Sequence, residues 1–509
     1  MRVIRTVSAL SLTHNSRILM ISSLSTQTPI SQMQSTSSTE QLSFGHASSL
    51  PAALASSALS GPFEGEAEVH GVIPAWLSGR LIRTAPAIFE FDGWRAQHWF
   101  DALGMLYSFE IGTNGRVHWM QRLLECEFNR SVLHGRNELA SFGTRNHRGL
   151  LQRLLHPTPR STDNANVNIR PEGRHWIAMT ETERQLSIDP ASLKTAAEAR
   201  FADALPNVRL ISAHPHDDAE RKELINIGVF FGVRSGLIVF SQAYGSAARR
   251  EIGRVPLRRV PYIHSFAITR TKIVLILAPY DLMPASLLWS KRPLSEHYRW
   301  SPEKGTRIVV MDRGSGKFVE HEGPPFFFFH TVNAFDLDEG AIRLELLAYD
   351  DASIIGKGMM MSDIRRKGLP SLTPNLRRIT IDPKRSDFRM DAVGPPVGFE
   401  FPMIHYSRAN GRRYRYIWGS DLSRLVRFDT TTDEATHRSL DGVTFGEPVF
   451  VANPEGSEED DGVLLTVGSS VISRGSEMTI WDARTLEILA RATVPIAIPV
   501  GFHGGFEPR

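Results

Sequence analysis

The sequence predicts an all-β fold, a seven-bladed β-propeller, and three observations support this prediction. From Glu64 onward the chain is a succession of short runs rich in Val, Ile, Leu and aromatic residues. Turn-forming pairs such as Asn114-Gly115 and Asn410-Gly411 separate these runs. About 440 residues of this kind are too many for one β-sandwich but suit seven blades of four strands. Because no repeat is visible as sequence identity, the prediction depends on the number and spacing of the strands.

Residues 1–63 differ from this pattern. Residues 1–39 contain no acidic residue, a few arginines and many Ser and Thr, a composition typical of disordered segments and of organelle transit peptides. Three interpretations stay open: a transit peptide for a plastid or mitochondrion, a disordered leader, or a start codon assigned too early, with Met20 or Met33 as the real start. In each case we expect residues 1–63 to lie outside the fold and residues 64–509 to form the propeller.

The predicted strands follow one another along the rest of the chain. They comprise residues 79–83, 105–111, 176–180, 224–231, 272–277, 307–311, 342–347, 463–467 and 478–482. The most apolar segment is 325–336, PFFFFHTVNAFD, in which four phenylalanines directly precede His330. A continuous apolar run of this length predicts a strand that is buried on both sides. A single histidine in such a strand is usually a core residue, so its role depends on the other histidines of the chain.

Composition and charge narrow the class of protein. With 41% apolar and 22% charged residues, the sequence is that of a globular protein, and its net charge of +3 predicts no nucleic-acid partner. Cys126 is the only cysteine, so no intramolecular disulfide can form, and a reducing compartment is indicated. No apolar run approaches the ~18 residues that a transmembrane helix needs. We therefore expect a protein inside the cytoplasm or an organelle.

Two stretches depart from the strand pattern and combine apolar with cationic residues. Residues 147–156 carry four leucines at helical spacing: Leu150, Leu151, Leu154 and Leu155. Residues 281–292 carry the exposed-looking Leu282, Met283, Leu287, Leu288 and Trp289, followed by Lys291 and Arg292. Such surfaces suit shallow insertion into a membrane interface. Simple packing on the propeller face is the alternative, and both stay open.

Four of the 18 histidines stand out by their apolar or glycine-rich surroundings. They are His214, His264, His330 and His503, in the segments ISAHP, PYIHSFAI, FFFFHTV and VGFHGGF. Successive members lie 50, 66 and 173 residues apart, close to one, one and three blades. Residues one blade apart lie on neighbouring inner strands and can converge on the axis. Four neutral imidazoles meeting there would bind a divalent transition metal and leave coordination sites open for reactants.

These residues resemble a known family, the carotenoid cleavage oxygenases. The segments that carry the resemblance are IPAWLSG at 73–79, RTAP at 83–86, HWFD at 98–101, AHP at 213–215, IHSFA at 263–267, FHTVNA at 329–334, EEDDGV at 458–463 and GFHG at 501–504. Each segment is weak evidence alone, but all occur in the family's order from about residue 64 to 506. The ordered set is highly specific.

The resemblance implies Fe(II) on the propeller axis, bound by His214, His264, His330 and His503, with a cap of helices and loops over the metal-bearing face. It also implies three glutamates around these ligands: Glu181, Glu400 and Glu447. An imidazole that binds a metal through one nitrogen needs an acceptor for its other N–H, and a carboxylate can serve. We therefore expect each glutamate to orient one ligand.

The resemblance further implies that O2 cleaves one conjugated double bond of a carotenoid or apocarotenoid into two carbonyl products. Three alternatives stay open: a stilbene-cleaving dioxygenase, a retinoid isomerohydrolase and a non-catalytic carotenoid-binding propeller. The segment after 142–144 lacks the cysteine-containing motif of vertebrate isomerases, and all four ligand histidines are present. Both points favour cleavage.

Two further expectations concern local structure. Ala85 and Ala102 occupy positions where the family usually has glycine, so either would be strained if its backbone required a positive φ. Because side chains alternate along a strand, we expect Phe326 to Phe329 to pack in the core rather than line a substrate tunnel. The sequence does not identify the tunnel residues, the substrate or the oligomeric state.

Overall fold

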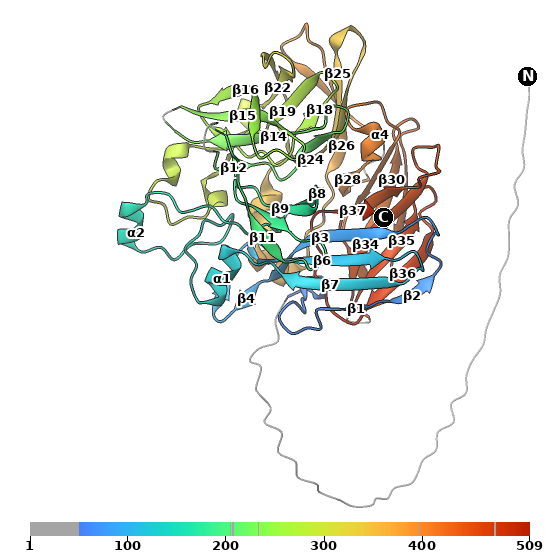
Figure 1. The fold of residues 1–509 in the computed structure, drawn as a ribbon. Coiled ribbons are helices and arrows are strands. Elements are labelled where there is room, and N and C mark those ends of the chain that lie inside the picture. Colours follow the sequence, from blue (N-terminus) through green and yellow to red (C-terminus); the bar gives the residue numbers. More distant parts are fainter. Residues whose placement is uncertain (1–49, 204, 206–207, 233, 395–396, 473–474) are drawn as a thin grey trace, which may run out of the picture. The chain divides into compact units, whose positions relative to one another are not determined.

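β-Strands are the predominant regular secondary structure of the described residues, and the helices among them are few and short (Figure 1). The computed structural model describes residues 50–509 except 204, 206–207, 233, 395–396 and 473–474. The α-helices in this part are α1 (Glu127–Leu133), α2 (Leu150–Leu155), α3 (Met361–Lys367) and α4 (Tyr406–Ala409). Short 3-10 or π segments are η1 (Ala52–Leu54), η2 (Trp99–Asp101), η3 (Pro284–Leu287), η4 (Leu294–His297), η5 (Pro302–Lys304), η6 (Asp338–Gly340) and η7 (Ile354–Gly358). The predicted mostly-β fold is confirmed.

Seven sheets of the described residues have four or more strands. The first has the order β1 (Glu64–Glu66), β7 (Val117–Leu123), β6 (Leu103–Ile111), β3 (Gly79–Ile88), β37 (Gly504–Pro508). The second has the order β11 (Thr195–Ala199), β10 (Gln185–Ile188), β9 (His175–Met179), β8 (Asn168–Glu172). The third has β12 (Leu210–Ile211), β14 (Glu223–Phe230), β15 (Ser235–Ala243), β16 (Arg249–Leu257), with β13 (His216–Asp218) also on β14.

The other four large sheets follow in chain order. The fourth is β18 (Ala267–Ile268), β19 (Lys272–Leu277), β22 (Thr306–Asp312), β23 (Phe318–Gly323). The fifth is β24 (Phe327–Asp336), β25 (Ile342–Tyr349), β26 (Asn375–Ile381), β27 (Phe388–Ala392). The sixth is β28 (Glu400–Met403), β29 (Tyr416–Ser420), β30 (Arg424–Asp429), β31 (Glu434–Ser439). The seventh is β2 (Glu68–Gly71), β36 (Ile488–Val494), β35 (Ser476–Asp482), β34 (Gly462–Ser470), β32 (Val443–Phe445), with β33 (Val449–Ala452) also on β34.

Two small sheets complete the described set. They are β17 (Val260–Pro261), β20 (Tyr280–Leu282), β21 (Arg299–Trp300) and the pair β4 (Glu90–Phe91), β5 (Trp94–Arg95). Strands of different large sheets also lie side by side: β18 beside β24, β24 beside β28, β33 beside β37 and β37 beside β8. Every one of the predicted strands lies within or overlaps a strand of the structure.

The first sheet contains the last strand of the chain, β37, and the seventh sheet contains an early strand, β2. β37 pairs with β3, with Gly79 opposite Pro508 and Arg83 opposite Gly504. β2 pairs with β36, with Glu68 opposite Thr493. Residues separated by more than 400 positions are therefore hydrogen-bonded neighbours in both sheets.

The apolar side chains of β24 enter two different parts of the core. Phe327 and Phe329 belong to one buried cluster, whereas Phe326 and Phe328 belong to another. The strand is thus buried on both sides, as its continuous apolar run predicted.

Residues 50–63 pack on the fold, although the sequence analysis assigned them to the leader. The Leu54 side chain is 1% exposed, the Val500 N–H donates to the Ala53 carbonyl over 2.8 Å, and the Ser57 N–H donates to the Ala497 carbonyl over 2.9 Å. The expectation that all of residues 1–63 lie outside the fold therefore does not hold for this part. The transit-peptide or leader interpretation concerns residues that lie outside the described ones and stays a prediction.

The two alanines at positions typical of glycine are unstrained. Ala102 has φ −59°, and Ala85 lies within β3 and is not among the residues with positive φ. The anticipated strain is absent at both positions.

Candidate metal centre

Four histidine side chains from four different sheets converge on one point. His214 lies between β12 and β13, His264 between β17 and β18, His330 in β24, and His503 directly before β37. Their ligand nitrogens all lie within 4.8 Å of one another. The Nε2–Nε2 distances are 2.9 Å for His214–His264, 3.2 Å for His264–His330 and 3.2 Å for His330–His503. Thus the structure brings together all four histidines that the sequence singled out.

This donor set fits a divalent transition metal. Two nitrogens that each lie ~2.1 Å from one ion, at right angles to each other, are about 3 Å apart, as the three nearest pairs are here. Imidazole nitrogens are ligands for iron, zinc, copper and nickel, whereas Mg²⁺ and Ca²⁺ prefer oxygen. A metal of the first class is therefore the ion that the site suits.

In three of the histidines, the Nδ1 atom, which faces away from the centre, is hydrogen-bonded to a glutamate carboxylate. His264 Nδ1 lies 2.5 Å from Glu181 Oε1. His330 Nδ1 lies 2.6 Å from Glu400 Oε2, and His503 Nδ1 lies 2.8 Å from Glu447 Oε1. Each Nδ1–H donates to its carboxylate, so each Nε2 keeps its lone pair for the shared centre. His214 has no carboxylate partner among the described residues.

Each of the seven large sheets has one member of this group within a strand or in a loop next to one of its strands. The histidines come from the third, fourth, fifth and first sheets. The glutamates lie beside β9 of the second sheet, at the start of β28 in the sixth, and between β32 and β33 in the seventh. The centre therefore depends on all seven sheets.

Irregular backbone directs two of these side chains. The register of β24 with β25 shifts between Phe328 and Thr331, and such irregularities re-aim a side chain, here that of His330. Phe401, next to Glu400, has φ +55°, and its N–H donates to Glu400 Oε2 over 3.0 Å. Backbone strain of this kind is concentrated at functional sites.

A further layer of hydrogen bonds fixes the glutamates. The Tyr262 hydroxyl donates to Glu181 Oε1 over 2.9 Å, and the Tyr349 hydroxyl donates to Glu400 Oε1 over 3.2 Å. Burial, followed by the neighbouring carboxylate, raises the pKa of Tyr262 and of Tyr349 well above the usual value. Both phenols therefore stay protonated and remain donors.

A buried arginine holds the third glutamate. Arg83 is 1% exposed; its Nη1 donates to the Glu447 carbonyl over 2.7 Å, its Nη2 donates to the Phe502 carbonyl over 2.8 Å, and Nη2 lies 3.6 Å from Glu447 Oε2. Gly504 permits this approach, because a Cβ there would lie 2.5 Å from the Arg83 side chain. Arg83 thus connects the backbone before His503 with the carboxylate that orients it.

Burial favours the neutral form of two of the imidazoles. It lowers the pKa of His214 well below the usual value, and the positive charge of the neighbouring imidazoles would lower it further. Burial also lowers the pKa of His264, although Glu181 opposes this shift. Neutral imidazoles are the form that binds a metal.

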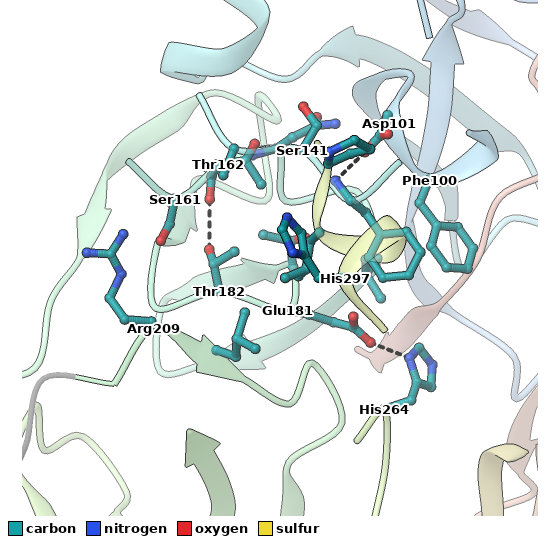
Figure 2. Close-up of a pocket in the computed structure, with 18 of the residues that line it drawn as sticks. Phe100, Asp101, Ser141, Ser161, Thr162, Glu181, Thr182, Arg209, His264 and His297 are labelled. Carbon is teal, nitrogen blue, oxygen red and sulfur yellow. Dashed lines mark hydrogen bonds and ion pairs between the residues drawn. The ribbon is translucent and has the colours of Figure 1, made fainter. Parts of the chain in front are cut away.

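A cavity of about 700 Å³ extends from the centre to the surface near η3. Figure 2 shows some of the side chains that line it. His264, His330 and His503 form part of its wall. Aromatic rings form much of the rest near the histidines: Trp99, Phe100, Phe128, Phe142, Phe329, Phe401 and Phe502. The prediction that Phe326 to Phe329 pack in the core rather than line a tunnel therefore holds only in part for Phe329, because this buried ring also borders the cavity.

Another part of the same cavity wall is polar. It includes Ser161, Thr162, Thr182 and Arg209 (Figure 2). The Thr182 hydroxyl donates to the Thr162 carbonyl over 2.7 Å, and Arg209 Nη2 donates to the Pro159 carbonyl over 3.0 Å. The sequence analysis missed these residues, because nothing in their local pattern distinguishes them from ordinary loop residues.

The mouth of this cavity lies beside an exposed apolar patch. We define the patch by the exposed side chains of Leu150, Leu151, Leu154, Leu155, Met283, Leu288 and Trp289. Arg153 Nη1 donates to the Trp289 carbonyl over 3.2 Å, and the Trp289 N–H donates to the Pro157 carbonyl over 2.9 Å. These bonds join the two stretches that the sequence singled out, and Leu288 also lines the cavity. Leu282, expected to be exposed, is instead fully buried in β20.

No described helix combines the length and the apolar composition required to cross a bilayer.

The chain is similar to known proteins over most of its length. The family model of the retinal pigment epithelial membrane protein matches residues 57–508. A chloroplastic carotenoid cleavage dioxygenase 8 homolog A of Oryza sativa subsp. japonica is 31% identical, over 88% of this chain and 86% of its own length. A carotenoid isomerooxygenase of Galleria mellonella is 30% identical, over 88% and 94%. The mitochondrial carotenoid-cleaving dioxygenase of Homo sapiens is 27% identical, over 91% and 92%.

Solved structures share this fold. A cobalt-substituted apocarotenoid oxygenase of Synechocystis superposes with a TM-score of 0.79. The two sequences are 24% identical, and the match covers 91% of this chain and 98% of the other.

Proposed function

This chain belongs to the carotenoid oxygenase family, that of the retinal pigment epithelial membrane protein, as its motifs predicted, and on this premise we propose that it is a non-haem Fe(II) dioxygenase. Its reaction is the cleavage of one conjugated double bond of a carotenoid or apocarotenoid by O2 into two carbonyl products. The convergence of four histidine Nε2 atoms at the end of an aromatic cavity is the observation that carries this proposal.

In this proposal His214, His264, His330 and His503 hold the iron, and Glu181, Glu400 and Glu447 orient three of them. Bound Fe(II) would supply the one-electron chemistry that allows O2 to react with a closed-shell alkene. The protein contributes the arrangement around it: the glutamates fix the tautomer and the ring angle of their histidines, and the buried tyrosines and Arg83 hold the glutamates in place.

The aromatic cavity would bind and orient the polyene. Its rings near His264 and His330 offer apolar faces to a conjugated chain, and they exclude water from the reacting bond. Holding one double bond beside the centre selects the bond that is cleaved. No side chain is required as a nucleophile, because both oxygen atoms of the products come from O2.

We further propose that the seven large sheets are the blades of a propeller, with a cap of helices and loops over the metal-bearing face. The contribution of one His or Glu by each sheet supports an axis through the four histidines. The neighbouring positions of β18, β24 and β28, and of β33, β37 and β8, support an inner ring of strands around it.

The proposed reaction is tested by isotope labelling. Purified full-length protein is loaded with Fe(II) without air, and then given β-carotene and ¹⁸O2. We expect two aldehyde or ketone products, each carrying one ¹⁸O atom, when the carbonyls are reduced immediately to prevent exchange with water. The control exchanges the labels, with H2¹⁸O and unlabelled O2, and should give unlabelled products.

Other outcomes of the same assay would redirect or refute the proposal. The substrate set also includes an apocarotenal, a retinyl ester and a hydroxylated stilbene. Labelled products from the stilbene alone would favour the stilbene-cleaving alternative, and unlabelled isomerised retinol would favour an isomerohydrolase. Bound iron with every substrate unchanged would favour a carotenoid-binding protein, and absence of bound iron would refute the metal centre.

The apolar patch is proposed to dock on a membrane, so that the polyene enters the cavity without crossing water. The leucines of α2 are 59–69% exposed, and Arg145, Lys291 and Arg292 lie exposed in the flanking segments, an arrangement typical of interfacial surfaces.

Replacing Leu151 and Leu154 by glutamate is expected to weaken vesicle binding by about tenfold for each substitution, about 1.4 kcal/mol apiece. Sedimentation with vesicles of phosphatidylcholine and phosphatidylserine measures this effect. Because both side chains are exposed, the thermal midpoint should stay unchanged. Val72→Glu, at another exposed apolar residue (78% exposed), is the matched control, and equal binding by all variants would contradict docking through this patch.

We propose that residues 1–49 direct the protein into an organelle. Two of the relatives described above are named as chloroplastic and mitochondrial, and the acid-poor composition of residues 1–39 supports the same assignment.

A further inference from the structure

A second cavity also reaches the four-histidine centre, at three of its histidines. Its volume is about 830 Å³, and His214, His330 and His503 form part of its wall. The first cavity is bordered by His264, His330 and His503 instead. Among the described lining residues, His214 therefore borders the second cavity alone and His264 the first alone. The histidines form a partition between the two spaces.

The two cavities reach the surface at different places. Leu288 and Arg292 are exposed lining residues of the first cavity, next to the apolar patch. Asp217, Tyr244 and Tyr406 are exposed lining residues of the second. In Figure 1, α2 of the apolar patch lies at the far left, whereas α4, which begins at Tyr406, lies on the right. A membrane or partner that covers the first mouth thus leaves the second mouth accessible.

The mouth of the second cavity is polar. His216 Nδ1 lies 3.0 Å from the Tyr406 hydroxyl, which also accepts from the Asp217 N–H over 3.1 Å. The Tyr244 hydroxyl donates to the Asp217 carboxylate. Glu172, another lining residue, pairs with Arg170. Two carboxylates therefore stand at the mouth, and only one cationic side chain accompanies them among the described lining residues.

Polar groups continue toward the histidines. Asn168 and Thr331 line the second cavity, and Glu447 lies on its wall beside His503. His214, partly buried, is the ligand histidine without a carboxylate partner among the described residues. A solute that enters by this cavity can therefore contact the His214 imidazole without disturbing a hydrogen bond between a histidine and a glutamate.

The two cavities differ in the desolvation cost that they impose on a hydrated divalent ion. Such an ion holds its water tightly, and moving it past apolar groups costs a large desolvation free energy. The first mouth is bordered by Leu287, Leu288 and the cationic Arg292. Near the histidines the wall is formed largely by aromatic rings, although Ser161, Thr162 and Arg209 make another part of it polar. Carboxylate, hydroxyl and amide oxygens along the second route can replace the ion's water step by step, and carboxylates at the mouth raise its local concentration.

We propose that the second cavity is the path by which a divalent metal ion enters the four-histidine site, separate from the cavity that would receive the polyene. This inference rests on the proposed metal centre. The site can then load its metal while the first cavity is filled by an apolar molecule or covered by a membrane.

Metal-uptake kinetics test this route. Metal-free full-length protein is mixed with Co²⁺, and the visible absorption of the cobalt–imidazole complex is followed with time. We expect Asp217→Lys, which places a cation at the second mouth, to lower the association rate constant on the order of tenfold at low salt, and less at high salt. Asp217→Asn keeps the shape of the side chain and should give a smaller decrease. The final stoichiometry of one Co²⁺ per chain should not change.

Leu288→Lys is the matched control, because it places the same cation at the first mouth. Its uptake rate should equal that of the wild type. A decrease for Leu288→Lys but not for Asp217→Lys would assign entry to the first cavity and overturn the proposal. Equal rates for all variants would overturn it as well. Failure of the wild-type protein to bind Co²⁺ would refute the metal centre itself, an outcome distinct from an unchanged rate.

Discussion

Replacing His330 by alanine is expected to abolish metal binding at the four-histidine centre and to lower the cleavage rate by about 10³-fold or more. His330 Nε2 lies 3.2 Å from the Nε2 atoms of both His264 and His503, so its loss removes the ligand that links the others. The substitution also leaves the carboxylate of Glu400, which is 2% exposed, without its Nδ1–H partner. Metal analysis of protein purified with excess Fe(II) measures the first effect, and product formation measures the second.

Two controls separate ligation from stability. Glu400→Gln keeps the size of the side chain but removes its charge, and we expect metal affinity to fall about 10- to 100-fold rather than to disappear. His437→Ala removes an exposed histidine of β31 and should leave metal content unchanged. Full metal content and activity in a folded His330→Ala protein would contradict the proposed ligand set.

Replacing Arg83 by methionine is expected to cost about 3–5 kcal/mol of unfolding free energy, because it leaves a buried carboxylate uncompensated. Arg83 donates to the carbonyls of Glu447 and Phe502 and accompanies the Glu447 carboxylate, and methionine supplies none of these interactions. His503 would also lose its fixed orientation, so metal affinity should fall about 10- to 100-fold. Urea unfolding and metal titration measure the two effects.

Arg80→Met is the matched control for this variant. Arg80 lies on the same strand, and its partner Glu110 is 26% exposed, so the cost should be ~1 kcal/mol or less. Arg83→Lys keeps the charge but not the forked donors, and an intermediate loss is expected. A loss for Arg83→Met no larger than that for Arg80→Met would show that the buried contacts contribute little.

Local sequence predicted the strands and the histidines, because both depend on short-range patterns. The apolar runs of β19 and β22 are continuous in sequence, and their side chains are buried in the structure. The apolar surroundings of His264 and His330 correspond to their burial. The glutamates could be chosen only through the resemblance, because their neighbours in sequence do not reveal a histidine 83 or 70 residues away.

The cavity walls could not be predicted from the sequence, because they join residues from many loops. Phe329 was assigned to the core from the alternation of β24, and it does pack there beside Phe327, but its ring also borders the cavity. Residues 50–63 were assigned to the leader from composition, although Leu54 is buried against the late segment near Val500. In both cases the outcome depends on segments that are distant in the sequence, which a local pattern does not reveal.

The exchange of strands between the first and last sheets has a consequence for how long the protein survives in a cell. The pairing of β3 with β37 and of β2 with β36 requires closure of a very long loop, and His503 stands directly before β37. An ion held by His503 and histidines of three other sheets binds only when this closure is complete. At a free concentration 100 times its Kd, such an ion adds ~2.7 kcal/mol to the folded state. Under the proposed metal role, the bound ion stabilises the closed fold. Proteases would degrade the protein faster when the metal is scarce, so the abundance of the protein in the cell would follow the metal supply.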